Sequence, residues 1–156
     1  MHKTRNDMAL RIRAAMVQLL NARLADALDL AAQAKQAHWN VRGANFIALH
    51  ELFDKLHAAA GEAADELAER AVALGGIASG TVQTVAHNTT LAAYPEGVSE
   101  SRAHLEALAG AFASFGKNIR KAIDLADKAG DADTADLFTG ISRDADKYLW
   151  MLEAHL

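Results

Sequence analysis

The sequence predicts an all-α fold, a four-helix bundle with one long crossover that contains a short helix. The first observation behind this prediction is composition: apolar residues make up 51% of the chain, with a single proline and ten glycines. That balance favours long helices over sheet. The second observation is that four long segments repeat apolar side chains at alternating spacings of three and four residues, which is the period of one helix face.

The first helix is expected to begin near Asn6 or Asp7, since either residue is a good N-cap. Residues 1–6 would then form a short N-terminal tail. The apolar stripe of this helix runs from Val17 onward and ends at His38. His38 is therefore expected to point inward, where a lone histidine is more often a hydrogen-bonded core residue than a ligand.

The second helix is expected to start at Asn45, after the break "NVRGAN", and to stop at Gly75 and Gly76. Glycine just beyond the last helical residue is a common stop signal. One face of this helix carries the apolar residues Leu49, Phe53, Leu56, Ala60, Ala63, Leu67 and Leu74.

A connection of about 25 residues follows, which is long for a bundle loop and indicates a crossover. It contains "TVQTVAH", a candidate short helix, and the turn "YPEG". The third long helix is expected from about Ser99. The fourth follows the turn "AGDADT", with Asp131 or Asp133 as its cap. With no repeat or linker in the sequence, residues 1–156 are expected to form a single domain.

Composition also limits the class of protein. The chain has no cysteine, which excludes disulfides and thiolate metal sites. No apolar run approaches the length of a membrane span, and "MHKTRNDMAL" has no signal-peptide core, so a cytoplasmic protein without a membrane partner is expected. A net charge of −4 argues against general affinity for nucleic acid.

The second helix carries a polar stripe that is separate from its apolar face. The stripe includes His50, Asp54, Asp65 and Glu69, and small residues such as Gly61 lie between its two halves. A merely solvated face would more often hold Lys and Glu here and would avoid glycine, which costs about 1 kcal/mol in a helix interior. The two halves are about 16 Å apart along the helix, too far apart to share one ion.

The stripe is symmetric about a point between Ala59 and Ala60. Three pairs lie at equal distances on either side of that point: His50 with Glu69, Asp54 with Asp65, and His57 with Glu62. If a second copy of this helix packs antiparallel about a two-fold axis there, each half faces the opposite half of its partner, as a C2 interface requires. The symmetry predicts two identical metal sites per dimer.

Imidazole and carboxylate ligands without thiolate suit Fe(II), Mn(II) or Zn(II) better than Ca(II) or Cu(I). The Glu-x-x-His pairs that hold two irons within one bundle are absent from this chain. Spacing alone leaves two interpretations equally open: a metal site shared between subunits, or a plain polar dimer face.

Together with "KQAHWNVRGANF", these residues resemble the Dps family, the ferritin-like DNA-binding proteins from starved cells. The resemblance continues through "LGG", the Tyr94–Pro95 turn and "DTADLF…SRDADKYLWMLEAHL", and it covers the chain from about Thr4 to the end. It implies a ferritin-like four-helix bundle, and hence a ferritin-like domain over residues 1–156.

The resemblance also implies a function. Dps-like proteins are mini-ferritins, hollow dodecameric shells built from two-fold dimers. They oxidise Fe(II), preferentially with hydrogen peroxide, and store ferric mineral, which protects DNA under oxidative stress. The implied ferroxidase ligands are those at the matching positions, with Asp65 and Glu69 coming from the partner subunit: His38, His50, Asp54, Asp65 and Glu69. Iron is the implied metal, and Zn or Mn can substitute for it.

Three further residues lie beside these ligands. Trp39 is expected to be a packing residue, with a role as an electron donor as the alternative. His57 and Glu62 fit the symmetry but not the family ligand set, and a cross-dimer salt bridge or a supporting role next to the metal is expected. The other histidines have no companion ligands and are expected at the surface: His2, His87, His104 and His155.

Three aspartates surround the turn into the fourth helix: Asp127, Asp131 and Asp136. One interpretation is helix capping and ordinary solvation. In Dps-like shells, acidic residues of this segment line three-fold pores, so an ion-pore role is the second interpretation.

DNA binding is where the chain departs from the best-known family pattern. Only Lys3 and Arg5 precede the expected first helix, in place of a lysine-rich tail, although Arg11 and Arg13 could add a small basic patch. A shell of twelve chains at −4 each would also repel a polyanion. Weak DNA binding is therefore expected, and the alternative is a nucleoid-associated, DNA-compacting protein whose iron chemistry is incidental.

Overall fold

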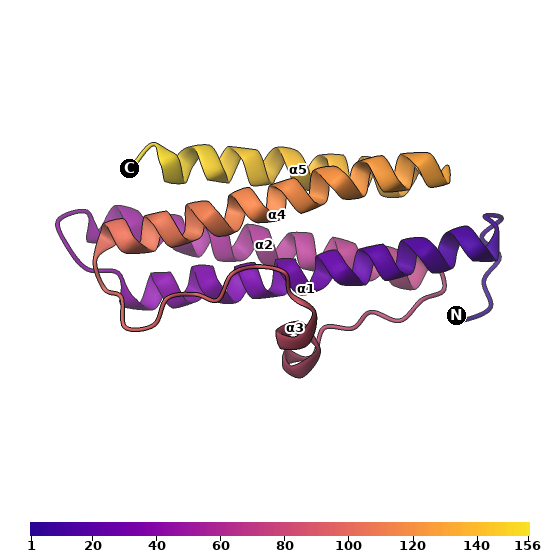
Figure 1. The fold of residues 1–156 in the computed structure, drawn as a ribbon, viewed down its shortest axis with the longest axis horizontal. Coiled ribbons are helices and arrows are strands. Elements are labelled where there is room, and N and C mark those ends of the chain that lie inside the picture. The colour runs from indigo at the N-terminus through magenta and orange to yellow at the C-terminus, as the bar shows by residue number, and fades with distance from the viewer.

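The computed structural model describes residues 1–156 and contains five helices and no strand. Helices α1 (Leu10–Asn40) and α2 (Phe46–Ala73) form one pair, and α4 (Ser101–Ala129) and α5 (Ala132–Glu153) form a second. The short helix α3 (Val82–Asn88) lies outside the bundle (Figure 1). The predicted all-α bundle with a helix in its crossover is confirmed.

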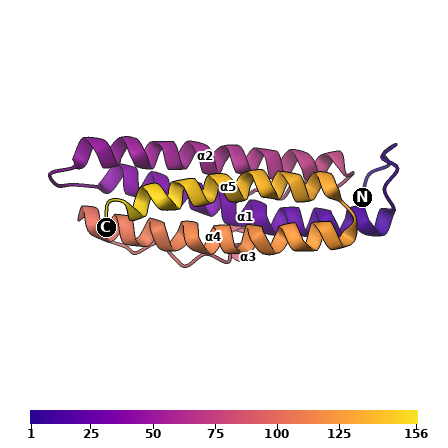
Figure 2. The ribbon, with the colours of Figure 1, turned by 90° about the horizontal axis from the view of Figure 1, so that it is seen from above.

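The four long helices run side by side, and the two chain ends lie at opposite ends of the bundle (Figure 2). The crossover leaves the end of α2 and returns along the whole length of the bundle to the start of α4 (Figure 1). This connection makes α2 and α4 run in the same direction. None of the helices combines the length and apolar character that a membrane-spanning helix needs.

A single apolar core of 33 buried residues fills the space between the long helices. Phe53 of α2 and Phe138 of α5 are its largest fully buried side chains. Many of the remaining positions are alanine, which lets the helices approach closely. The inward faces of all four long helices follow the predicted periodicity, so burial of these stripes is the main force that holds the bundle together.

The end of α2 depends on two glycines. Gly75 has φ +85°, a backbone conformation that side chains with a Cβ rarely adopt. At Gly76 a Cβ would lie only 2.4 Å from Cγ1 of Val17 on α1. The first glycine therefore permits the turn, and the second permits close passage of the chain over α1.

The first helix begins at Leu10, later than the predicted start near Asn6 or Asp7. The side chain of Asn6 accepts a hydrogen bond from the Met8 amide (3.0 Å) and forms a local turn instead of a helix cap. Arg13 then donates to the Met8 carbonyl and to the Leu74 carbonyl, both at 3.0 Å. These bonds fold the residues before α1 back against the end of α2.

A fully buried carboxylate, Asp26 on α1, fastens the crossover to the bundle. Its Oδ1 atom accepts from the amide and the hydroxyl of Thr90, at 2.8 and 3.0 Å. Its Oδ2 atom pairs with Arg23 at 3.3 Å and lies 3.5 Å from the Asn118 amide of α4. The buried charge is therefore compensated, as a stable interior carboxylate requires.

His104 near the start of α4 is fully buried, so its predicted surface position is wrong. It lies against the ring of Phe53 and 2.5 Å from the Tyr94 hydroxyl of the crossover. Burial raises the pKa of Tyr94 to about 12, so this hydroxyl stays protonated at neutral pH. Burial also lowers the pKa of His104, an effect that the nearby Asn40 backbone opposes in part.

His104 is expected to make stability sensitive to acid. Folding favours its neutral ring, so its contribution is complete above the unfolded-state pKa of about 6.5 and is lost as the pH falls toward the lowered folded-state pKa. Each pH unit between these two pKa values costs at most about 1.4 kcal/mol. The His104→Gln variant should show a shallower fall in urea midpoint between about pH 7 and pH 5. His87→Gln, at an exposed position of α3, is the control, and equal slopes in the two variants would contradict the assignment.

Candidate metal centre

His38 near the end of α1 and His50 in the second turn of α2 lie face to face. Their rings stack with centroids 3.6 Å apart and an angle of 23° between the planes. The His38 Nδ1 atom lies 2.8 Å from the His50 carbonyl oxygen, and the His50 Nδ1 atom lies 2.8 Å from the His38 carbonyl oxygen. The backbone of each helix thus holds the histidine ring of the other helix, through two reciprocal hydrogen bonds.

These hydrogen bonds determine which ring nitrogen can bind a metal. A carbonyl oxygen only accepts hydrogen bonds, so each Nδ1 atom must carry the hydrogen and donate it. In a neutral ring the lone pair is then on Nε2. A backbone acceptor on one nitrogen and a free lone pair on the other is the usual arrangement of metal-ligating histidines. His38 and His50 are therefore both oriented as ligands.

Asp54 lies one turn beyond His50 and forms an ion pair with Lys35 of α1. The Lys35 Nζ atom is 2.5 Å from Oδ1 of Asp54, and the two side chains are 27% and 53% exposed. The hydrogen bond from Lys35 lowers the pKa of Asp54, which desolvation opposes and nearby positive charge assists. The carboxylate is therefore ionised at neutral pH, and its Oδ2 atom remains available to a cation.

Asp65 and Glu69 are exposed on α2, about four and five turns beyond His50. The structure does not bring them to the histidines: no group of three or more His, Asp or Glu side chains in the chain could hold a metal ion. One molecule alone thus presents two separate parts of the predicted ligand set on one helix.

The residues expected beside the ligands differ in their surroundings. Trp39 is 67% exposed, so it is not a packing residue within its own chain. The half-buried His57 holds its Nδ1 atom 2.9 Å from the Ala31 carbonyl oxygen of α1. Glu62 is exposed, and neither residue forms a salt bridge within the chain.

The three candidate pore residues also differ in their exposure to solvent. Asp127 and Asp136 are exposed. Asp131 is only 1% exposed and caps α5 by accepting from the Thr134 amide at 3.0 Å. It also pairs with Arg70 of α2 at 2.8 Å. Asp131 is therefore a helix cap and an ion-pair partner, the first of its two interpretations, and it does not face solvent as a pore-lining residue must.

Lys35 is a charged neighbour of the candidate ligands that the sequence-based prediction omitted. It lies three residues before His38 on the same helix, and residues with that spacing share a helix face. Helical spacing from His38 was therefore the signal that could have found it. Its contact with Asp54 depends on the packing of α1 against α2, which the sequence pattern alone does not align.

The crossover bundle and the two oriented histidines beside a carboxylate define the class as ferritin-like. A family model described as a ferritin-like domain matches residues 17–156. The DNA protection during starvation protein of Agrobacterium fabrum is 47% identical over 155 residues, covering 99% of this chain and 96% of that protein. Its namesake in Listeria innocua is 33% identical over 140 residues, covering 89% and 90%.

Solved structures agree with these relatives. DpsC from Streptomyces coelicolor superposes with a TM-score of 0.94 at 32% identity, covering 98% of this chain and 90% of that one. Dps from Microbacterium arborescens, in its high iron form, gives a TM-score of 0.86 at 38% identity, covering 92% and 93%. The chain belongs to the Dps family of ferritin-like proteins.

Proposed function

We propose that the protein is a mini-ferritin that oxidises Fe(II), preferentially with hydrogen peroxide, and stores the ferric product inside a shell of twelve subunits. Each oxidation centre combines His38, His50 and Asp54 of one subunit with Asp65 and Glu69 of a second copy. Zn(II) and Mn(II) are expected to compete for the same ligands, which are of the imidazole and carboxylate type that these ions share with iron.

The observation that carries this proposal is the reciprocal pair of hydrogen bonds between His38 and His50. Two Nε2 lone pairs are held on one face of the α1–α2 pair, and Asp54 adds an ionised carboxylate one turn away. The remaining carboxylates lie at positions that a two-fold axis near Ala59 would bring opposite these ligands. Residue types and symmetry together supply a five-ligand set for Fe(II).

The chemistry requires two irons near each other. Hydrogen peroxide accepts two electrons, and each Fe(II) gives one, so two Fe(II), one peroxide and two protons yield two Fe(III) and two water molecules. Because both electrons arrive together, no hydroxyl radical is released. The carboxylates of Asp65 and Glu69 favour the harder Fe(III) product, and the imidazoles of His38 and His50 help to retain Fe(II).

Assembly of the chain into a shell is supported by the large apolar side chains that it leaves in solvent. Trp39, Val82 and Trp150 are 67%, 80% and 65% exposed. Large exposed apolar groups often mark surfaces that bind other protein molecules. In this proposal these side chains are covered by other copies of the chain.

The test adds Fe(II) anaerobically to the purified protein, then peroxide, and follows ferric absorbance and hydroxyl-radical yield with a spin trap. The expected result is one peroxide consumed for every two Fe(II), with radical yield suppressed relative to protein-free solution. Ferric absorbance no faster than in protein-free solution would overturn the proposal. A DNA gel shift on the same sample tests the alternative, a DNA-compacting protein.

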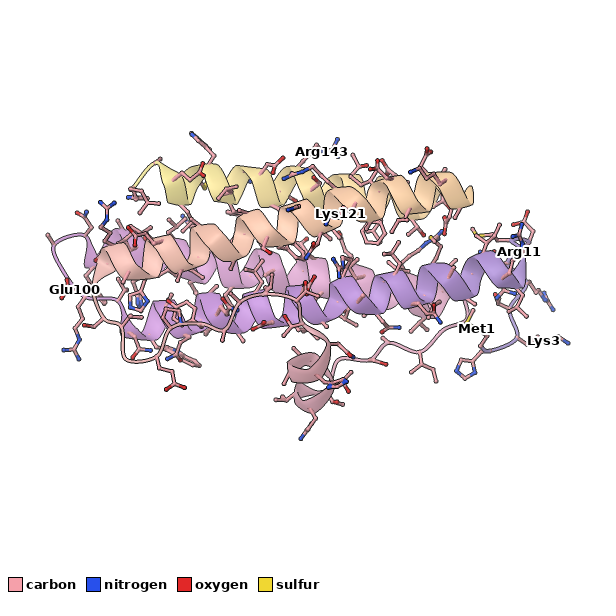
Figure 3. The ribbon with its side chains drawn as sticks, viewed as in Figure 1. Met1, Lys3, Arg11, Glu100, Lys121 and Arg143 are labelled. Carbon is pink, nitrogen blue, oxygen red and sulfur yellow. The ribbon has the colours of Figure 1, made fainter.

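The contacts of the basic residues near the N-terminus support weak DNA binding. Arg13 is buried and donates to two backbone carbonyls, so it cannot contact phosphate. Lys3 and Arg11 extend from the same end of the bundle (Figure 3). In this proposal, protection of DNA, the role for which the relatives are named, follows from removal of Fe(II) and peroxide.

Iron entry is expected to depend on the exposed carboxylates of Asp127 and Asp136. Their charge reversal, Asp127→Lys with Asp136→Lys, should slow Fe(II) oxidation about tenfold at low salt, because focused negative potential raises local cation concentration by 10-fold or more. The effect should shrink at about 0.15 M salt, where the Debye length is about 8 Å. Stopped-flow oxidation at the two ionic strengths measures it.

The matched control is Glu96→Lys with Glu153→Lys, which reverses two exposed charges away from this turn. If both double variants slow oxidation equally, the effect comes from overall charge and the pore role is excluded.

A further inference from the structure

His57 on α2 contacts α1 next to the contacts that the candidate ligands of α2 make with the same helix. The row is an antiparallel ladder whose rungs are His38 with His50, Lys35 with Asp54, and Ala31 with His57. Successive rungs are one helical turn apart on both helices. His57 therefore lies on the same face of α2 as His50 and Asp54, although it is not among the five ligands of the proposed oxidation centre.

The hydrogen bond of His57 orients its ring in the same way as that of His50. The Nδ1 atom lies 2.9 Å from the Ala31 carbonyl oxygen, so Nδ1 carries the hydrogen and the lone pair of the neutral ring is on Nε2. The half-buried ring borders an open groove whose lining includes Lys35, Gln36 and Trp39. No group of its own chain forms a hydrogen bond with Nε2.

The symmetry of α2 places a carboxylate opposite this lone pair. His57 and Glu62 lie at equal distances from the point between Ala59 and Ala60, as do the two pairs of the proposed centre. In an antiparallel α2 dimer, each His57 therefore faces Glu62 of a second copy, about 4 Å from the axis along the helix. The two oxidation centres lie further out, about 11 Å from the axis on each side.

A lone pair and a carboxylate that face each other repel, and either a proton on Nε2 or a metal cation between them removes this repulsion. We propose that His57 and Glu62 of a second copy hold a divalent cation, a pair of auxiliary sites between the two oxidation centres. This inference rests on the dimer of the proposed function. One imidazole and one carboxylate, completed by water, suit Fe(II), Co(II) or Zn(II). Having fewer protein ligands, each auxiliary site binds more weakly than the centre and keeps Fe(II) within reach of it.

The test uses Co(II) alone, titrated anaerobically into the assembled protein by calorimetry. The unmodified protein is expected to bind a tight set and a weaker set of ions, and His57→Gln or Glu62→Gln should each lose the weaker set and keep the tight one. His87→Gln, which alters an exposed histidine of α3, should lose neither. Sedimentation velocity checks that every variant remains assembled.

The outcomes separate this inference from the proposed function. Absence of the tight set from the unmodified protein would overturn the proposed centre. If both variants keep the tight set and an unchanged weaker set, the auxiliary site is overturned. If the variants keep both sets of ions but assemble less stably, His57 and Glu62 form a salt bridge only, and the auxiliary site is again overturned.

A second measurement does not depend on the variants. Crystals of the unmodified protein soaked in Co(II) should give an anomalous peak at about 2.0–2.1 Å from Nε2 of His57, the distance usual for a divalent metal and imidazole nitrogen. A peak at His50 with none at His57 would overturn the auxiliary site alone.

Discussion

Replacing Asp65 with asparagine and Glu69 with glutamine is expected to slow peroxide-driven Fe(II) oxidation at least about 100-fold. Loss of residues that merely support metal ligands already costs about 10–100-fold, and this variant removes two proposed ligands from each centre. Both side chains are exposed, so the fold and the assembly should persist. Stopped-flow ferric absorbance and sedimentation velocity measure the two effects.

The control for this experiment is Glu96→Gln with Glu153→Gln, which removes two exposed carboxylates from the crossover and from the end of α5. It should oxidise iron at the unmodified rate. Unchanged kinetics in the Asp65→Asn, Glu69→Gln variant would show that oxidation occurs elsewhere and would exclude a centre shared about this axis.

A large side chain at Gly61 is expected to abolish both assembly and iron oxidation while leaving the bundle folded. Gly61 lies beside the proposed two-fold axis, and a Cβ at this position would meet no atom of its own chain within 4 Å. Gly61→Arg should even strengthen α2, because glycine costs about 1 kcal/mol in a helix interior. The guanidinium would keep the α2 helices of two subunits apart. Each set of ligands on one subunit would then lose the ligands of its partner, and the rate of Fe(II) oxidation should fall at least about 100-fold, by analogy with ligand loss.

Gly110→Arg on α4 is the matched control, since a Cβ there also meets no atom within 4 Å. Circular dichroism should show full helicity in both variants. Only Gly61→Arg should shift to dissociated subunits in sedimentation velocity. If dissociated Gly61→Arg protein still oxidised iron at the unmodified rate, a single subunit would be sufficient, and the shared centre would be disproved.

The course of the helices was largely predictable because their apolar stripes are long and regular. Asn45 and Asp131 are N-cap residues as predicted, but only Asp131 has a side-chain hydrogen bond to its helix. The prediction failed at the start of α1. There, Asn6 is used in a local turn, and the path of the chain is set by Arg13 through its bond to the Leu74 carbonyl, a contact between residues far apart in the sequence.

Side-chain environment was less predictable than helix position. His104 has no companion ligands in sequence and was expected at the surface, yet the return of the crossover puts Tyr94 against it and buries it. Asp131 was compatible with a cap or a pore. Its burial and its bond to Arg70 decide for the cap, because they require α2 to pack beside the α4–α5 turn.

The sequence by itself determined the helical class and the symmetric positions of the four candidate ligands on α2, because both follow from residue spacing along a helix. Only the tertiary structure decided how those side chains are held. The packing of α1 against α2 locks the rings of His38 and His50 through each other's backbone, pairs Asp54 with Lys35, and gives His57 the same ring orientation. The "HELFDKLHAAAGEAADELAER" segment supplies four of the five candidate ligands, and its packing against α1 determines which atoms of His50 and Asp54 a metal can reach.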